Sequence, residues 1–186
     1  RKFFEQASKM SWYENTLFVI TADHASAQIN LKEYNTSWGY FSIAIFFFDP
    51  SASYETEGPI PLRNEIIQQM DIMPSVLSYL NYDKPYVGFG QNIFNPGSKR
   101  VAYNFLDDTY QAFSGSYLLQ FDGKKSVGLY DFRNDPLMLS NLLAQLPDSV
   151  SAIELPLKAF IQQYNNRMVD DNLTTAGPIN STGKKP

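Results

Sequence analysis

The residues of this chain that could carry chemistry gather where an apolar run ends on Asp23 and on His24, the only histidine. The run reads TLFVITADHASAQ, from Thr16 to Gln28. A carboxylate and a neutral imidazole are both good ligands for Zn²⁺ or Mn²⁺, and two adjacent residues in a turn can converge on one ion. By themselves the same residues also fit a local role, in which Asp23 caps the turn and His24 hydrogen-bonds within it. The pair is a candidate metal site that needs further ligands.

A strand has to position this pair. Residues 16 to 21 form a short run rich in β-branched and apolar side chains, and residues 42 to 48, SIAIFFF, form a second one. Neither run alternates, which is typical of central strands covered on both faces of a parallel sheet. Ligands of open α/β sheets collect at the carboxyl ends of such strands. The sequence therefore predicts an α/β fold with Asp23 and His24 at the edge where sites form.

Helical periodicity predicts three helices around these strands. The first covers residues 1 to about 13, and the second follows Asp71, which can cap it, with Pro74 in its first turn. The third starts near residue 155 and runs for about 15 to 20 residues. The density of Pro, Ser and Gly between 49 and 65 predicts a surface loop.

Looser alternation from residue 101 onward predicts an antiparallel sheet. Asp122 and Gly123 are a strong hairpin signal between the last two of its strands. The predicted strands lie in VAYNFL, YLLQF and SVGLYDF, at 101–106, 117–121 and 126–132.

The composition narrows the function classes. Of the 186 residues, 44% are hydrophobic, so the chain can form a core, and the net charge of -4 leaves no basic footprint for a nucleic acid. Because there is no cysteine, disulfides and thiolate metal sites are excluded. No apolar run approaches the roughly 20 residues that a spanning helix needs.

Four stretches in order carry a family resemblance: WYENTLFVITADH, GYFSIAIFFFDP, QMDIMPSVLSYL and GFGQNIF, followed by VGLYDFRNDPLMLSNLL. Together they resemble the sulfatase-like enzymes of the alkaline phosphatase superfamily, and most closely the lipoteichoic acid synthase-like phosphoglycerol transferases. The likeness covers roughly residues 1 to 168. Asp23 and His24 match the family's metal-binding pair, whereas Thr21 reads as a strand residue.

The resemblance implies a metal-dependent parent enzyme, either a phosphoryl (phosphoglycerol) transferase or a sulfuric or phosphoric ester hydrolase. The divalent ion is Mn, Zn, Mg or Ca, which the sequence does not distinguish. The family's nucleophile, a Thr, Ser or modified Cys, stands before the Asp-His strand, and Thr36, Ser37 and Ser75 all follow it. We therefore expect this chain to lack a catalytic residue, to be inactive alone, and to need the missing N-terminal half of the catalytic domain as its partner.

The resemblance also implies the organisation of the chain and the place of its parent. Residues 1–98 are expected to be the C-terminal portion of the α/β sulfatase-like catalytic domain, 99–170 an antiparallel sheet with a C-terminal helix, and 171–186 a polar, flexible tail. The parent is expected to be membrane-anchored, with this domain at the extracytoplasmic face of the bacterial cytoplasmic membrane and a phosphoglycerol lipid or a sulfate or phosphate ester as substrate. Strands left without partners predict self-association of the chain.

Two other interpretations stay open at this point. The chain could be a non-catalytic binding or interaction module of a bacterial envelope protein, with the antiparallel sheet as the presenting surface. Three further acidic groups could also be imagined as acid/base pairs, although solvated turns and caps account for them more simply: Asp107 with Asp108, Asp131 with Asp135, and Asp170 with Asp171.

Overall fold

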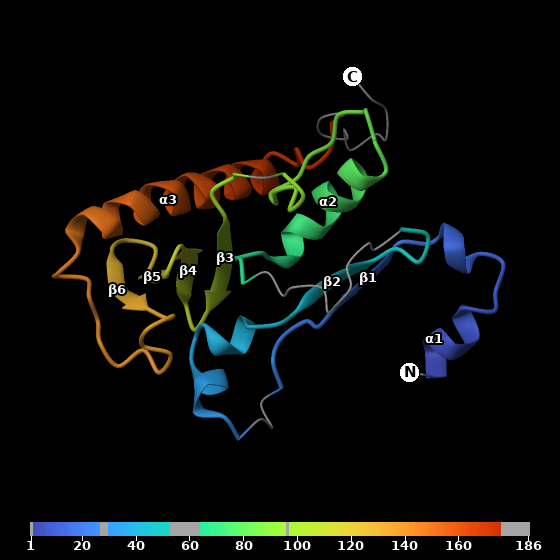
Figure 1. The fold of residues 1–186 in the computed structure, drawn as a ribbon. Coiled ribbons are helices and arrows are strands. Elements are labelled where there is room, and N and C mark those ends of the chain that lie inside the picture. Colours follow the sequence, from blue (N-terminus) through green and yellow to red (C-terminus); the bar gives the residue numbers. More distant parts are fainter. Residues whose placement is uncertain (1, 27–29, 53–63, 96, 176–186) are drawn as a thin grey trace. The chain divides into compact units, whose positions relative to one another are not determined.

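The computed structural model describes residues 2–26, 30–52, 64–95 and 97–175 (Figure 1). The chain divides into two compact units, Arg1–Asn64 and Glu65–Pro186. Most of the loop predicted for 49–65 and most of the tail predicted for 171–186 lie outside the described residues. In the part of the chain that is described, no helix is long and apolar enough to cross a membrane.

The first unit is built on a two-stranded sheet of β1 (Phe18–Thr21) and β2 (Ile45–Phe48). The strands pair antiparallel, with Phe18 opposite Phe48 and Thr21 opposite Ile45. Both predicted strands are therefore confirmed, but their parallel arrangement is wrong. The chain returns between them through two short 3₁₀ turns, Lys32–Asn35 and Gly39–Phe41. An apolar run without alternation carries no information about strand direction, and no residue of β1 or β2 is fully buried.

Aromatic side chains hold this sheet to the N-terminal segment. The helix α1 (Lys2–Ala7) is six residues long, about half of the predicted length, and the 3₁₀ turn Tyr13–Asn15 follows. The ring of Phe4 lies 5.2 Å from that of Phe18 and 5.9 Å from that of Phe48, centroid to centroid. These contacts place the start of β1 and the end of β2 against the first helix.

The second unit is an antiparallel sheet under one long helix, α3 (Pro147–Val169) (Figure 1). The strand order is β3-β4-β5-β6, so each strand pairs with the next along the chain. The strands are β3 (Val101–Leu106), β4 (Thr109–Ser114), β5 (Tyr117–Phe121) and β6 (Ser126–Asp131). The apolar side chains between the sheet and α3 form the core, whose buried members are Ala112, Leu119, Phe121, Leu129, Ile153 and Leu157.

The antiparallel sheet and the closing helix were both predicted, with two differences. The strand β4 was not predicted; it follows β3 through a two-residue turn at Asp107 and Asp108, both with positive φ. The helix α3 begins eight residues before Leu155, because Pro147 occupies its first turn and Pro156 is accommodated inside it. Asp122 forms the predicted hairpin turn: its carboxylate accepts hydrogen bonds from the Lys124 and Lys125 amides.

The helix α2 (Ile72–Tyr79) is held by Asp71 and Ser75, but not through the predicted cap. The Asp71 carboxylate makes no cap hydrogen bond to α2; it accepts from the amides of Gln68 at 3.0 Å and Gln91 at 2.7 Å. The Ser75 hydroxyl accepts from the Ile93 amide at 3.0 Å. A buried carboxylate and a buried hydroxyl thus join α2 to the segment some 20 residues later.

Gly90 lies in the same junction and allows the two backbones to approach. A Cβ at this position would lie 2.0 Å from the carbonyl oxygen of Met70, a distance that no side chain tolerates. Any substitution of Gly90 therefore has to separate the backbone of residues 70 and 71 from residues 90 and 91.

Candidate metal centre

Asp23 and His24 lie in the turn that directly follows β1, as the sequence predicts. The turn starts two residues after Thr21, the last residue of the strand. The side chains are open to solvent, with 87% of Asp23 and 44% of His24 exposed. A strand end that leaves both groups accessible can present them to an ion or a substrate.

The imidazole of His24 is held in one orientation from two sides. Its Nδ1 lies 2.8 Å from the carbonyl oxygen of Ala25. Its ring stacks on that of Tyr40 at 4.9 Å between centroids and 8° between planes. The Ala25 amide in turn donates to the Tyr40 carbonyl oxygen at 2.9 Å, which ties the turn to the 3₁₀ turn Gly39–Phe41. The chain thus positions His24 through neighbours rather than leaving it to rotate.

The contact with Ala25 determines which ring nitrogen can bind an ion. A carbonyl oxygen only accepts, so Nδ1 carries the proton and Nε2 of a neutral ring keeps its lone pair. Histidine ligands commonly donate their second nitrogen to a carbonyl or carboxylate, which fixes the tautomer in this way. Nε2 is therefore the ring nitrogen of His24 that is available to accept a ligand or a hydrogen bond.

Asp23 lies next to that nitrogen. Its Oδ2 is 3.5 Å from Nε2 of His24, and its Oδ1 accepts from the His24 amide at 2.9 Å. Two donors about 2.1 Å from one tetrahedral ion are separated by about 3.4 Å, so the two atoms are spaced as ligands of one ion. The backbone hydrogen bond from His24 holds the pKa of Asp23 below its ordinary value, which keeps the carboxylate ionised as a ligand must be.

The donor set fits a divalent ion but does not complete its coordination. Among the described residues, no group of three or more His, Cys, Asp or Glu side chains could hold a metal. The positioning residues Ala25 and Tyr40 were not predicted, since a carbonyl and a stacked ring leave no signature in the sequence beyond the aromatic dipeptide Tyr40-Phe41.

The other acidic candidates are turn residues. The Asp131 carboxylate accepts from the backbone and side-chain nitrogens of Asn134, at 3.2 and 2.8 Å, and Asp135 accepts from the Ser140 amide at 2.8 Å. Asp107 and Asp108 form the turn between β3 and β4. Since each carboxylate of the 131–135 group binds local backbone, the structure gives these residues a conformational role.

We expect the isolated chain to bind Zn²⁺ or Mn²⁺ no more tightly than roughly micromolar, because it presents two ligands where a catalytic site uses three or more. Isothermal titration calorimetry measures this affinity, with His24→Ala abolishing binding. Asp83→Ala, which removes an exposed carboxylate from the second unit, is the matched control and should leave the titration unchanged. A nanomolar site that His24→Ala removes would mean that further ligands lie within this chain.

Comparison with known proteins gives a likeness in structure but none in sequence. No family model and no curated protein matches the chain. A solved protein of the alkaline phosphatase superfamily from Vibrio parahaemolyticus is 21% identical and superposes with a TM-score of 0.57 over 88% of this chain. A Bacteroides thetaiotaomicron protein labelled 6S-sulf, from a locus for the metabolism of multiple glycosaminoglycans, is 15% identical, with a TM-score of 0.58 over 85% of this chain.

These matches confirm, at the level of the fold, the resemblance found in the sequence. The chain is a mixed α/β structure with small antiparallel sheets and a C-terminal helix, and it shares that arrangement with part of each match. It spans 39% of the length of the Vibrio structure and 41% of the Bacteroides structure. The chain therefore corresponds to about two fifths of the larger proteins that it resembles.

Proposed function

We propose that this chain forms part of the catalytic domain of a metal-dependent enzyme that transfers or hydrolyses a phosphoryl or sulfuryl ester, with phosphoglycerol transfer as the favoured reaction. The fold likeness to alkaline phosphatase superfamily and sulfatase structures supports the class of enzyme. The observation that carries the proposal is the geometry of His24, whose Nε2 is left as an acceptor 3.5 Å from the Asp23 carboxylate.

In this proposal Asp23 and His24 hold a divalent ion, which is Mn, Zn, Mg or Ca. When bound, the ion would lower the pKa of a nucleophile and neutralise charge on the transferred group. The chain's own residues do the positioning. Ala25 keeps the proton on Nδ1 of His24, Tyr40 holds the plane of the ring, and the His24 amide orients the Asp23 carboxylate.

The rest of the site is proposed to lie in other parts of a larger protein. The nucleophile and the remaining ligands would come from a segment that pairs with this chain, since the solved structures that match are more than twice its length. We propose that the larger protein is anchored at the extracytoplasmic face of a bacterial cytoplasmic membrane and acts on a phosphoglycerol lipid or polymer, or on a sulfate or phosphate ester. The proposals on location and substrate are based on the resemblance of the sequence motifs between Trp12 and Leu143 to the phosphoglycerol transferases.

We expect the purified chain to show no phosphodiesterase or sulfatase turnover, because the nucleophile of the enzymes it resembles stands before the Asp-His strand, whereas Thr36, Ser37 and Ser75 all follow it. The measurement is release of nitrophenol from bis-nitrophenyl phosphate and nitrophenyl sulfate, with Zn²⁺ or Mn²⁺ in excess. Hydrolysis that Asp23→Ala removes would mean that the chain contains its own nucleophile. A chain that neither turns over nor binds metal would instead favour the non-catalytic interaction module.

A further inference from the structure

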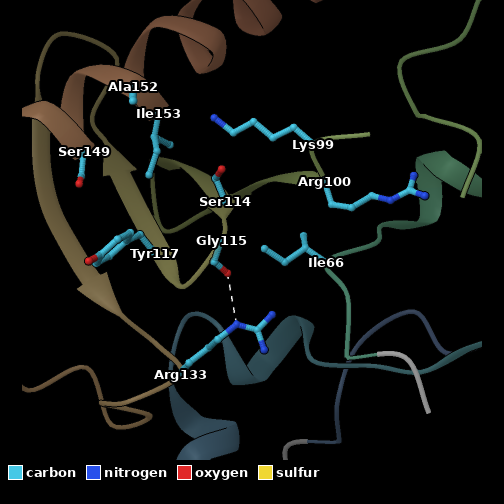
Figure 2. A pocket seen from close by; sticks show the side chains of 10 residues that line it. All are labelled: Ile66, Lys99, Arg100, Ser114, Gly115, Tyr117, Arg133, Ser149, Ala152 and Ile153. Carbon is cyan, nitrogen blue, oxygen red and sulfur yellow. Dashed lines mark hydrogen bonds between the residues drawn. The ribbon is translucent and has the colours of Figure 1, made fainter. Parts of the chain in front are cut away.

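A hollow of about 370 Å³ lies within the second unit and contains none of the residues discussed above as metal ligands. It opens at the end of the layer between the sheet and α3, where β3 begins and β4 turns into β5 (Figure 2). Three kinds of group line it: cations, hydroxyls and apolar side chains. They are Lys99, Arg100 and Arg133; Ser114, Tyr117 and Ser149; and Ile66, Ala152, Ile153 and Gly115.

The three cations that line the hollow differ in their contacts. Arg100 is a structural clamp, because its guanidinium donates to the carbonyl oxygens of Asn92, Ile93 and Asn95 and pairs with Glu65 at 3.6 Å. Arg133 donates from Nε to the Gly115 carbonyl oxygen at 3.3 Å, which shapes the β4–β5 turn at the rim (Figure 2). Lys99 forms no ion pair with any described carboxylate.

Lys99 is therefore the cation of the hollow that has no acidic partner among the described residues. None of its lining residues is acidic, although the whole chain carries a net charge of -4. The first turn of α3 contributes Ser149 to the same wall, and no side chain caps that helix end, so its amides add to the positive potential. The Lys99 ammonium group is thus available to bind an anion, and the concave surface around it strengthens its electrostatic potential.

Ser114 supplies the second observation. It is the last residue of β4 and only 7% exposed, yet its hydroxyl is hydrogen-bonded to none of the described residues. In Figure 2 the hydroxyl of Ser114 and the side chain of Lys99 both extend toward the α3 side of the hollow, near Ile153. The Ser114 hydroxyl lines the hollow and has no protein partner among the described residues, so it is available to a ligand or a water there.

We propose that this hollow binds a small amphipathic anion. Its phosphate or carboxylate head is held by the Lys99 ammonium group and the Ser114 hydroxyl, and its short apolar body lies against Ile66, Ala152 and Ile153. The volume is at the lower end of that of small-molecule pockets, which fits a head group with a chain of a few carbons. The hollow belongs to the second unit and shares no residue with the proposed metal centre in the first, so the proposal does not depend on the chemistry of that centre.

Calorimetry or ligand-observed NMR with the full chain tests this, using hexyl phosphate, hexanoate, inorganic phosphate and hexanol as probes. We expect one of the first two to bind with a dissociation constant below about 1 mM, and phosphate and hexanol to bind at least about tenfold more weakly, since each offers half of the recognised chemistry. The stronger of hexyl phosphate and hexanoate identifies the head group.

Variants separate this site from general charge effects. Lys99→Gln and Ser114→Ala should each weaken binding about tenfold, and Lys124→Gln, which removes the same charge from the β5–β6 turn, should leave it unchanged. Equal losses of affinity in Lys99→Gln and Lys124→Gln would overturn the proposal. So would the absence of binding of either amphipathic anion at about 10 mM. A Ser114→Ala variant that retains full affinity would also overturn the assigned role of the hydroxyl.

Discussion

In the larger enzyme of which we propose this chain to be a part, His24→Ala lowers kcat/KM by at least about 100-fold, and Asp23→Ala does the same. Each change removes one of the two atoms, Nε2 and Oδ2, that lie 3.5 Å apart and that we propose bind one ion. A 100-fold loss corresponds to about 2.7 kcal/mol in the activation free energy, which is well within what a metal ion supplies to charge stabilisation. The stability of the protein should change little, because the Asp23 side chain is 87% exposed and that of His24 is 44% exposed and outside the core.

The measurement is steady-state turnover of a phosphodiester or sulfate ester over a titration of Mn²⁺ and Zn²⁺, with thermal unfolding of each variant beside it. Tyr40→Leu, which removes the ring stacked on His24, should raise the metal concentration needed for half activity, and Tyr40→Phe should restore it. Asp83→Ala is the control for loss of an exposed carboxylate. If the His24 and Asp23 variants both keep more than half of the activity, the metal assignment is wrong.

The candidate site could be located from sequence because strand ends and ligand types are local properties. The run before Asp23 predicts a strand, and the structure ends β1 at Thr21, two residues before the pair. Its supports could not be predicted in the same way. Tyr40 stacks on His24 because the segment that connects β1 to β2 brings the two rings together. The path of such a connection is not predicted by any local sequence pattern.

In the fold, too, local features could be predicted from the sequence and long-range features could not. The Asp122-Gly123 turn was predicted because the residue types demand it, whereas the Asp107-Asp108 turn, which needs the same positive φ without glycine, was not recognised, and β4 was missed with it. The antiparallel pairing of β1 and β2 could not be read from two apolar runs, since strand direction is decided by the connection and not by composition.

Two of the stretches that carry the family resemblance owe their residue types to a contact between them. In QMDIMPSVLSYL, the carboxylate of Asp71 and the hydroxyl of Ser75 are the acceptors, and in GFGQNIF the amides of Gln91 and Ile93 are the donors. Gly90 lets the second backbone approach the first. Phe89 then places its ring 5.9 Å from that of Phe160 on α3, so the same segment links α2 to the closing helix. These residues of the two motifs therefore have an architectural role.

This contact gives the largest stability effect that we expect in the chain. Asp71→Ala leaves the amides of Gln68 and Gln91 without their acceptor in a place where the carboxylate itself is only 3% exposed. Each hydrogen bond to a charged group is worth about 1.5 to 3 kcal/mol, so the loss of both bonds should cost about 3 kcal/mol at the lower end of this range. For a unit of this size the unfolding midpoint should fall by about 10 to 15 °C.

Far-UV circular dichroism follows this loss, because the 23 residues of α3 lie in the same unit as Asp71. Both tryptophans, Trp12 and Trp38, lie in the first unit, so their fluorescence reports separately on a part of the chain that the substitution does not touch. Asp71→Asn, which keeps one carbonyl oxygen, should lose about half as much, and Asp83→Ala should stay within about 0.5 kcal/mol of the unchanged protein. An Asp71→Ala chain as stable as the Asp83→Ala control would show that the Gln68 and Gln91 amides find water or another acceptor, and that the Asp71 carboxylate does not hold α2 to residues 90–93.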